Sequence, residues 1–128
     1  MRLLLDTHAL LWMITGDARL PQPARSAIAH GADLTFVSAA NAWEITTKHR
    51  LGKLPSASEL AADFEAVARQ ACFEQLPISV AHASLAGKLE GTHRDPFDRM
   101  LIAQALLENL TLVSNETAFD RFGVSRLW

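Results

Sequence analysis

The chain has 128 residues, of which 49% are hydrophobic and 20% are charged, and its formal net charge at pH 7 is −2. This length predicts a single domain over residues 1–128, and the composition excludes an intrinsically disordered chain. The small negative charge excludes a general electrostatic attraction to nucleic acid, so local basic residues or bound metal would have to hold a polyanion.

The N-terminal residues do not have the pattern of a targeting or membrane segment. They form a short apolar run interrupted by Arg2, and Asp6 follows too early for a signal peptide or a membrane span. The single cysteine, Cys72, excludes an internal disulfide and is expected to be a small buried side chain. We therefore expect a soluble, cytoplasmic protein with no membrane partner.

Apolar runs and segments with helical spacing alternate along the chain. Runs rich in leucine and valine predict strands at residues 3–5, 34–37, 76–80 and 110–113. Helical spacing predicts helices at about 8–15, 23–30, 39–50, 58–72, 80–89, 96–109 and 116–122. This alternation predicts an α/β fold, namely a three-layer α/β/α sandwich around a central, mostly parallel sheet.

Acidic residues lie where several of the predicted helices begin. Asp6 ends the first apolar run, Asp95 and Asp98 belong to the HRDPFD segment, and Glu116 follows the last strand. A further carboxylate, Glu44, lies in the helix after the second strand. The carboxyl ends of parallel strands line one edge of a sheet, where ligands bind in a crevice, so these residues are expected to meet in one acidic pocket.

Each acidic residue also has a structural explanation. Aspartate caps the free N–H groups of a helix start, and Asp95 before Pro96 is typical of such a cap. Glu44 and Lys48 have the spacing of an exposed helical ion pair. Asn41 lies on the same helix face as Glu44 and is expected to hydrogen-bond a metal-bound water or a neighbouring carboxylate.

The position of Asp98 is harder to explain by capping. It shares a helix face with Leu101, Ile102 and Ala105, which is the face expected to pack on the sheet. A bound cation would explain why all these carboxylates are present together, because carboxylates that lie close together repel each other unless a cation neutralises them.

The donor set indicates Mg²⁺ or Mn²⁺, since hard oxygen ligands predominate and no His or Cys has zinc-ligand spacing. Such ions serve phosphodiester hydrolysis, in which they activate the attacking water and neutralise the leaving oxygen. Basic residues near the acids are expected to form a lip that binds RNA phosphates. These residues are Lys48, Arg50, Arg94 and Arg99.

Four segments together resemble PIN-domain proteins and, more narrowly, the VapC-type toxins of bacterial toxin–antitoxin pairs. They are LLLDTHALLW, SAANAWEITTKHRLGKL, HRDPFDRMLIAQAL and LTLVSNETAFDRFGV, and the resemblance runs from Leu3 to about Val124. It implies a PIN-like fold, Mg²⁺- or Mn²⁺-dependent endoribonuclease activity on structured RNA, and neutralisation by a cognate antitoxin. It also implies a homodimer, and the apolar run at residues 10–14, which contains Trp12, is compatible with an interface.

The resemblance also assigns roles to residues by position. Asp6, Glu44 and Asp98 fall on the metal-binding acids, and Asp95 is an additional acid of the HRDPFD motif. Glu116 stands where aspartate is often found and is one methylene longer, so it is expected to act through water. The catalytic set is therefore Asp6, Glu44, Asp95, Asp98 and Glu116, with Thr7, Asn41 and Ser114 as supporting polar residues.

Two alternatives remain open from the sequence. One is a Mg²⁺-dependent phosphatase with Asp6 as the nucleophile, but the dehalogenase-type pattern requires an aspartate two residues later, where His8 stands. The other is a non-catalytic RNA- or protein-binding PIN-like domain that keeps the acidic cluster for a structural ion.

Overall fold

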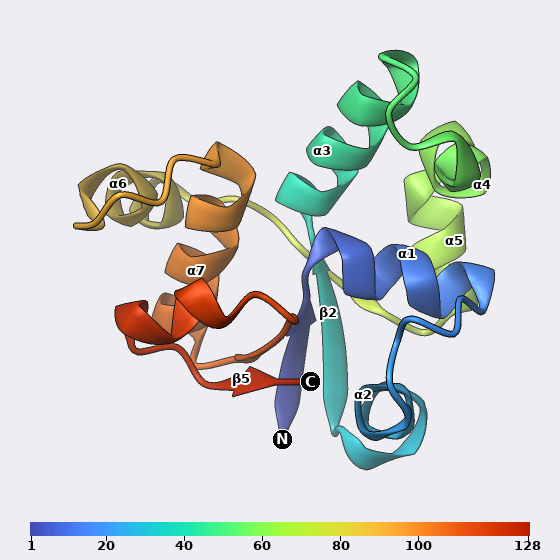
Figure 1. Cartoon of the computed structure of the whole chain (residues 1–128), viewed down its shortest axis with the longest axis horizontal. Helices are drawn as coiled ribbons and strands as arrows, with labels where there is room; N and C mark the ends of the chain where they lie inside the picture. The colour runs from blue at the N-terminus through green and yellow to red at the C-terminus, as the bar shows by residue number, and fades with distance from the viewer.

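A five-stranded parallel sheet lies at the centre of the computed structural model, which describes residues 1–128 (Figure 1). The strands are β1 (Arg2–Leu5), β2 (Leu34–Ser38), β3 (Glu74–Leu76), β4 (Thr111–Val113) and β5 (Arg126–Leu127). Their order in the sheet is β3-β2-β1-β4-β5, and every neighbouring pair is parallel. The predicted α/β sandwich is confirmed.

Helices cover both faces of this sheet. Figure 1 shows α1, α2, α4 and α5 on one side of the strands and α6 and α7 on the other, while α3 extends from the carboxyl end of β2. No helix is long and apolar enough to cross a membrane. The helical elements are α1 (Thr7–Thr15), α2 (Gln22–Ser26), η1 (Ala27–Gly31), α3 (Ala39–Arg50), η2 (Pro55–Ala57), α4 (Ser58–Ala62), α5 (Phe64–Gln70), α6 (Val80–Lys88), α7 (Pro96–Glu108) and η3 (Thr117–Phe122).

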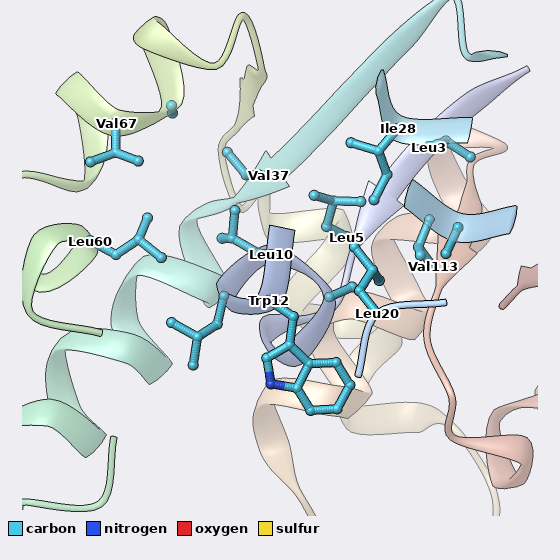
Figure 2. Close-up of a cluster of buried hydrophobic side chains, with 14 of the residues drawn as sticks. Leu3, Leu5, Leu10, Trp12, Leu20, Ile28, Val37, Leu60, Val67 and Val113 are labelled. Atoms are coloured by element: carbon cyan, nitrogen blue, oxygen red, sulfur yellow. The ribbon is translucent and has the colours of Figure 1, made fainter. Parts of the chain in front are cut away.

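Two hydrophobic cores result from the alternation of side chains along the strands. Leu3 and Leu5 of β1 enter the core beneath α1, α4 and α5, which Figure 2 shows in close-up. Leu4 enters the opposite core together with Leu101 and Ile102 of α7. All three β1 leucines are fully buried. Successive strand residues point to opposite faces, so β1 joins both layers at the centre of the molecule.

The topology places a crevice between β1 and β4. The chain moves outward from β1 through β2 to β3, and later fills the other half of the sheet with β4 and β5. The strand order therefore reverses next to β1, and in open α/β sheets ligands bind at such a point, outside the carboxyl ends of the strands. Asp6 leaves β1 at this edge, and its backbone N–H donates to the Val113 carbonyl of β4 at 3.0 Å.

Several element boundaries differ from those predicted. The helix expected at residues 58–72 is two helices, because Asp63 leaves helical geometry and caps α5 through the Ala66 N–H. The third strand ends at Leu76 rather than beginning there, since Pro77 has no N–H for a sheet bond. The helix expected at 23–30 passes from α2 into the π-helical turn η1. Strand β5 was not predicted, because two residues carry no periodic pattern.

Two expectations about burial were wrong. Cys72 is exposed and adopts a positive φ of 60° in the turn after α5, so it is not a core side chain. The apolar run at residues 10–14 is not spare surface for an interface, because its large residues Leu10, Leu11 and Trp12 belong to the core. Figure 2 shows Trp12 beside the leucines of that core.

Candidate active site

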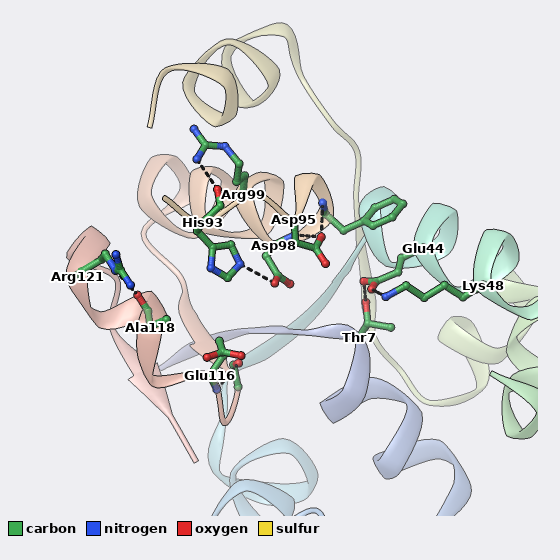
Figure 3. A network of polar contacts seen from close by, with 12 residues as sticks. Thr7, Glu44, Lys48, His93, Asp95, Asp98, Arg99, Glu116, Ala118 and Arg121 are labelled. Atoms are coloured by element: carbon green, nitrogen blue, oxygen red, sulfur yellow. Dashed lines mark hydrogen bonds and ion pairs between the residues drawn. The ribbon is translucent and has the colours of Figure 1, made fainter. Parts of the chain in front are cut away.

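A small polar cavity of about 110 Å³ opens at the carboxyl ends of β1 and β4. All five predicted catalytic acids line it, although they come from four separate segments of the chain. Figure 3 shows four of them, Glu44, Asp95, Asp98 and Glu116. The prediction that they share one pocket is therefore supported by geometry. The lining residues are Asp6, Thr7, His8, Glu44, Lys48, Asp95, Asp98, Asn115, Glu116 and Phe119.

Asp6 is positioned by the junction of β1 with α1. Its Oδ1 accepts the Ala9 N–H at 2.8 Å, so it caps α1 as well as lining the cavity. The residue is only 7% exposed, and burial raises the pKa of its carboxyl, against the lowering effect of the Ser114 hydroxyl and the Ala9 N–H. A buried aspartate favours its neutral form unless a positive charge is supplied.

Glu44 is held on α3 by two protein donors. Its Oε1 accepts the Thr7 hydroxyl at 2.5 Å, and its Oε2 lies 2.5 Å from the Lys48 Nζ (Figure 3). The expected helical pair with Lys48 exists, but it is not an exposed pair, because Glu44 is only 4% exposed. This carboxylate therefore belongs to the cavity.

Asn41 plays a different role from the one expected. Its Oδ1 accepts the Ser38 N–H at 2.7 Å as part of the capping box of α3, and its Nδ2 donates to the Thr7 hydroxyl at 3.2 Å. It does not line the cavity. Asn41 thus orients Thr7, and Thr7 in turn holds Glu44.

The start of α7 contributes two further acids. Asp95 accepts the N–H groups of Phe97 and Asp98 and so caps the helix, as predicted. The Oδ2 of Asp98 lies 2.8 Å from the Nε2 of His93 (Figure 3). Burial raises the pKa of Asp98 to about 6, against the lowering by His93, and the nearby Asp95 and Glu44 carboxylates add to the increase.

The segment after β4 completes the cavity. Ser114 is fully buried, and its hydroxyl accepts the Glu116 N–H at 3.0 Å. Ser114 does not line the cavity, whereas the exposed Glu116 does. Ser114 therefore supports the segments that carry Asp6 and Glu116, since its hydroxyl also lowers the pKa of the Asp6 carboxyl.

The four basic residues predicted for RNA binding do not form one lip. Lys48 lines the cavity, whereas Arg50 and Arg94 are exposed outside it. Arg99 donates to the carbonyls of Ala86, Leu89 and His93. Its position therefore indicates that it anchors the segment between α6 and α7 and does not face a ligand.

The structure also gives roles that the sequence did not predict to residues near the acids. His93 contacts Asp98 from five positions earlier, across a loop whose path sequence spacing does not reveal. His8, Asn115 and Phe119 line the cavity as well. Their only signal in the sequence is that they lie within four residues of a predicted acid.

The cavity residues fit a hard divalent cation by their donor chemistry. Five carboxylates surround a small space, and burial raises the pKa of both Asp6 and Asp98, so a cation would balance their charge. As the side chains stand, no three His, Cys, Asp or Glu residues converge closely enough to hold an ion. The acids instead use protein donors, chiefly Lys48 and His93.

The largest hollow on the molecule lies elsewhere. It measures about 580 Å³ and runs beside edge strand β3, between α3 and the start of α5. Its two carboxylates are Asp63, which caps α5, and Glu65. The cluster of acids therefore marks the small cavity, and not the largest one, as the candidate active site.

Comparison with known proteins identifies the family and agrees with the fold. The family model of the PIN domain matches residues 3–124. No curated protein sequence matches the chain significantly. Among solved structures, the chain is similar to VapBC2 from Rickettsia felis bound to a promoter DNA fragment, with 18% identity, a TM-score of 0.69, and coverage of 99% of this chain and 98% of that chain.

Two further solved structures have the same fold. FitAcB from Neisseria gonorrhoeae is 18% identical, with a TM-score of 0.68 and coverage of 98% of this chain and 96% of that chain. VapC20 from Mycobacterium tuberculosis, described as a toxin that cleaves the Sarcin-Ricin loop, is 15% identical, with a TM-score of 0.67 and coverage of 95% of both chains.

Proposed function

This chain belongs to the PIN-domain family, and from that membership we propose that it is a metal-dependent endoribonuclease that acts as the toxin of a toxin–antitoxin pair. We take residues 1–128 as one nuclease domain working in the cytoplasm. The observation that carries the proposal is the meeting of Asp6, Glu44, Asp95, Asp98 and Glu116 in one cavity. A fold alone would not support an activity, because function depends on the site.

Asp6, Glu44 and Asp98 form the negative centre that binds Mg²⁺ or Mn²⁺. When bound, the ion polarises the scissile phosphate and promotes ionisation of the attacking water. Thr7 fixes the direction of the Glu44 carboxylate, and Ser114 supports Asp6. Asp95 and the exposed Glu116, which also line the cavity, orient water. Lys48, with Arg50 and Arg94 further out, attracts RNA phosphates.

The partners follow from the same set of relatives. The similar structures include VapBC complexes, in which a toxin is accompanied by its antitoxin, and one relative is described as a toxin that cleaves the Sarcin-Ricin loop. We propose that this protein likewise cleaves structured RNA, is neutralised by a cognate antitoxin and forms a homodimer. Structured RNA is read mainly by its shape and by contacts to its sugars and phosphates, so its recognition does not require a surface that reads individual bases.

One observation favours a second candidate, a non-catalytic PIN-like binding domain. Glu44 and Asp98 are already paired with Lys48 and His93, so the acids do not need an ion to be satisfied in the fold. In that case the cluster would be structural. The two candidates differ in whether RNA is turned over.

The experiment is to incubate the purified protein with total cellular RNA in Mg²⁺ or Mn²⁺ and to map new 5′ ends. We expect discrete new ends that disappear with chelator and in Asp6→Asn protein, but persist in Glu74→Gln, which removes an exposed carboxylate on β3 far from the cavity. Undiminished cleavage by Asp6→Asn would contradict the proposal. No cleavage by the wild type, with binding of RNA retained, would favour the non-catalytic domain.

A further inference from the structure

Lys48 is the only lysine or arginine that lines the acidic cavity. Its Nζ lies 2.5 Å from the Glu44 Oε2, and its side chain is 32% exposed. The Lys48 ammonium therefore stands inside the cavity, in direct contact with one of its carboxylates.

The Lys48 ammonium forms its ion pair with Glu44. Its Oε2 faces the Lys48 ammonium, and its Oε1 accepts the Thr7 hydroxyl, so both carboxylate oxygens have protein partners. Residues four apart on a helix face each other, which makes the pair a fixed property of α3. A buried carboxylate needs such a partner, because an unpaired buried charge is strongly destabilising.

Resting on the metal-dependent function above, we propose that the Lys48 ammonium takes the place of a second metal ion in this site. It neutralises the charge of Glu44, while a single divalent ion neutralises the charge of the remaining carboxylates. In this arrangement Glu44 is a positioning residue that reaches the ion through water. Asp6 and Asp98 are the acids that contact it.

The contacts of the three acids support this division. An ion binding Glu44 directly would compete with Lys48 or Thr7 for a carboxylate oxygen and would bring its charge beside the ammonium. Asp98 has a single side-chain partner, His93, and its side chain is 25% exposed. Asp6 accepts the Ala9 N–H through Oδ1 and is also a partner of the Ser114 hydroxyl, but neither of these groups carries a charge. Mg²⁺ typically takes only one or two carboxylates directly and keeps several waters, so two acids are sufficient.

The test is the number of Mn²⁺ ions bound per chain, measured by calorimetric titration and by electron paramagnetic resonance of free Mn²⁺. We expect one ion in the wild type and two in Lys48→Gln, because loss of the ammonium leaves Glu44 free to bind a second ion. Lys48→Arg keeps the charge and should bind one. Lys53→Gln, which removes an exposed lysine outside the cavity, should also bind one.

A double variant, Lys48→Met with Glu44→Gln, removes the pair without changing the net charge. We expect it to bind one Mn²⁺ with an affinity about 10- to 100-fold below that of the wild type, the loss usual for an outer-sphere partner, while Asp98→Asn loses more. This measurement also decides the matter if Lys48→Gln does not fold.

Two ions in the wild type, one ion in folded Lys48→Gln, or a loss greater than about 100-fold in the double variant would each overturn the inference. A wild type that binds no Mn²⁺ would contradict the metal-dependent function itself, and the inference with it. Failure of the inference alone is therefore distinguishable, because the wild type would still bind metal.

Discussion

Asp98 and His93 are joined by their side chains at the entrance to α7, with 2.8 Å between Oδ2 and Nε2. The His93 ring also packs edge-on against Phe119 and Phe122, with centroid distances of 5.5 and 6.4 Å. Burial nevertheless raises the pKa of Asp98 to about 6, so its carboxyl titrates near neutrality. The stability and the chemistry of the cavity are therefore linked at this residue.

The first prediction concerns pH and the stability of the metal-free protein. The folded pKa of Asp98, about 6, lies above the ordinary value of 3.8, so the folded state binds the proton more tightly. Stability should therefore rise as pH falls from about 7 towards 4, by at most about 3 kcal/mol from this group. Thermal unfolding in chelator measures the effect. Asp98→Asn should lack this component, and an identical pH profile in that variant would contradict the assignment.

The second prediction is that Asp6→Asn separates folding from activity. Asparagine caps a helix about as well as aspartate, so its amide oxygen still accepts the Ala9 N–H and α1 is retained. The variant loses the negative charge, and RNA cleavage should fall by at least about 100-fold. Circular dichroism should be unchanged and the melting temperature should not fall. A variant that unfolds would instead show that Asp6 is mainly structural.

The third prediction is that millimolar Mg²⁺ or Mn²⁺ raises the melting temperature of the wild-type protein. The ion binds only the folded cavity, where it offsets the repulsion between carboxylates, so binding adds to the free energy of unfolding. At 100 times the dissociation constant, the gain is about 2.7 kcal/mol. Differential scanning calorimetry with and without chelator measures it. If metal changed the melting temperature of neither the wild type nor Asp98→Asn, the result would favour simple helix capping.

The fourth prediction concerns Thr7, whose hydroxyl joins Asn41 to Glu44. Thr7→Val leaves two buried polar groups without a partner, so the free energy of unfolding should fall by about 1–3 kcal/mol. Thr46→Val makes the same change at an exposed position of α3 and should alter stability by less than about 0.5 kcal/mol. Urea unfolding compares the two variants. Equal effects would show that the buried hydroxyl network does not stabilise the fold.

Much of the architecture could be predicted from local sequence signals. The apolar runs at β1 and β2, the limits of α3 and the Asp95–Pro96 start of α7 were all visible, because helix caps and hydrophobic periodicity are properties of neighbouring residues. Two features could not be predicted in this way. The break at Asp63 depends on whether this residue continues one helix or caps the next, and the two-residue strand β5 depends on its pairing with β4.

The sequence by itself determined which acids are present, that all but Glu44 lie at strand ends or helix starts, and that Glu44 faces Lys48 on one helix, and the resemblance of its motifs identified the PIN-domain family. Only the tertiary structure decided the contacts between segments and across loops: Glu44 with Thr7, and Asp98 with His93. The physical reason is that capping and periodicity act within one turn of the chain. Burial and charge balance depend on segments that meet only when the sheet brings β1 and β4 together.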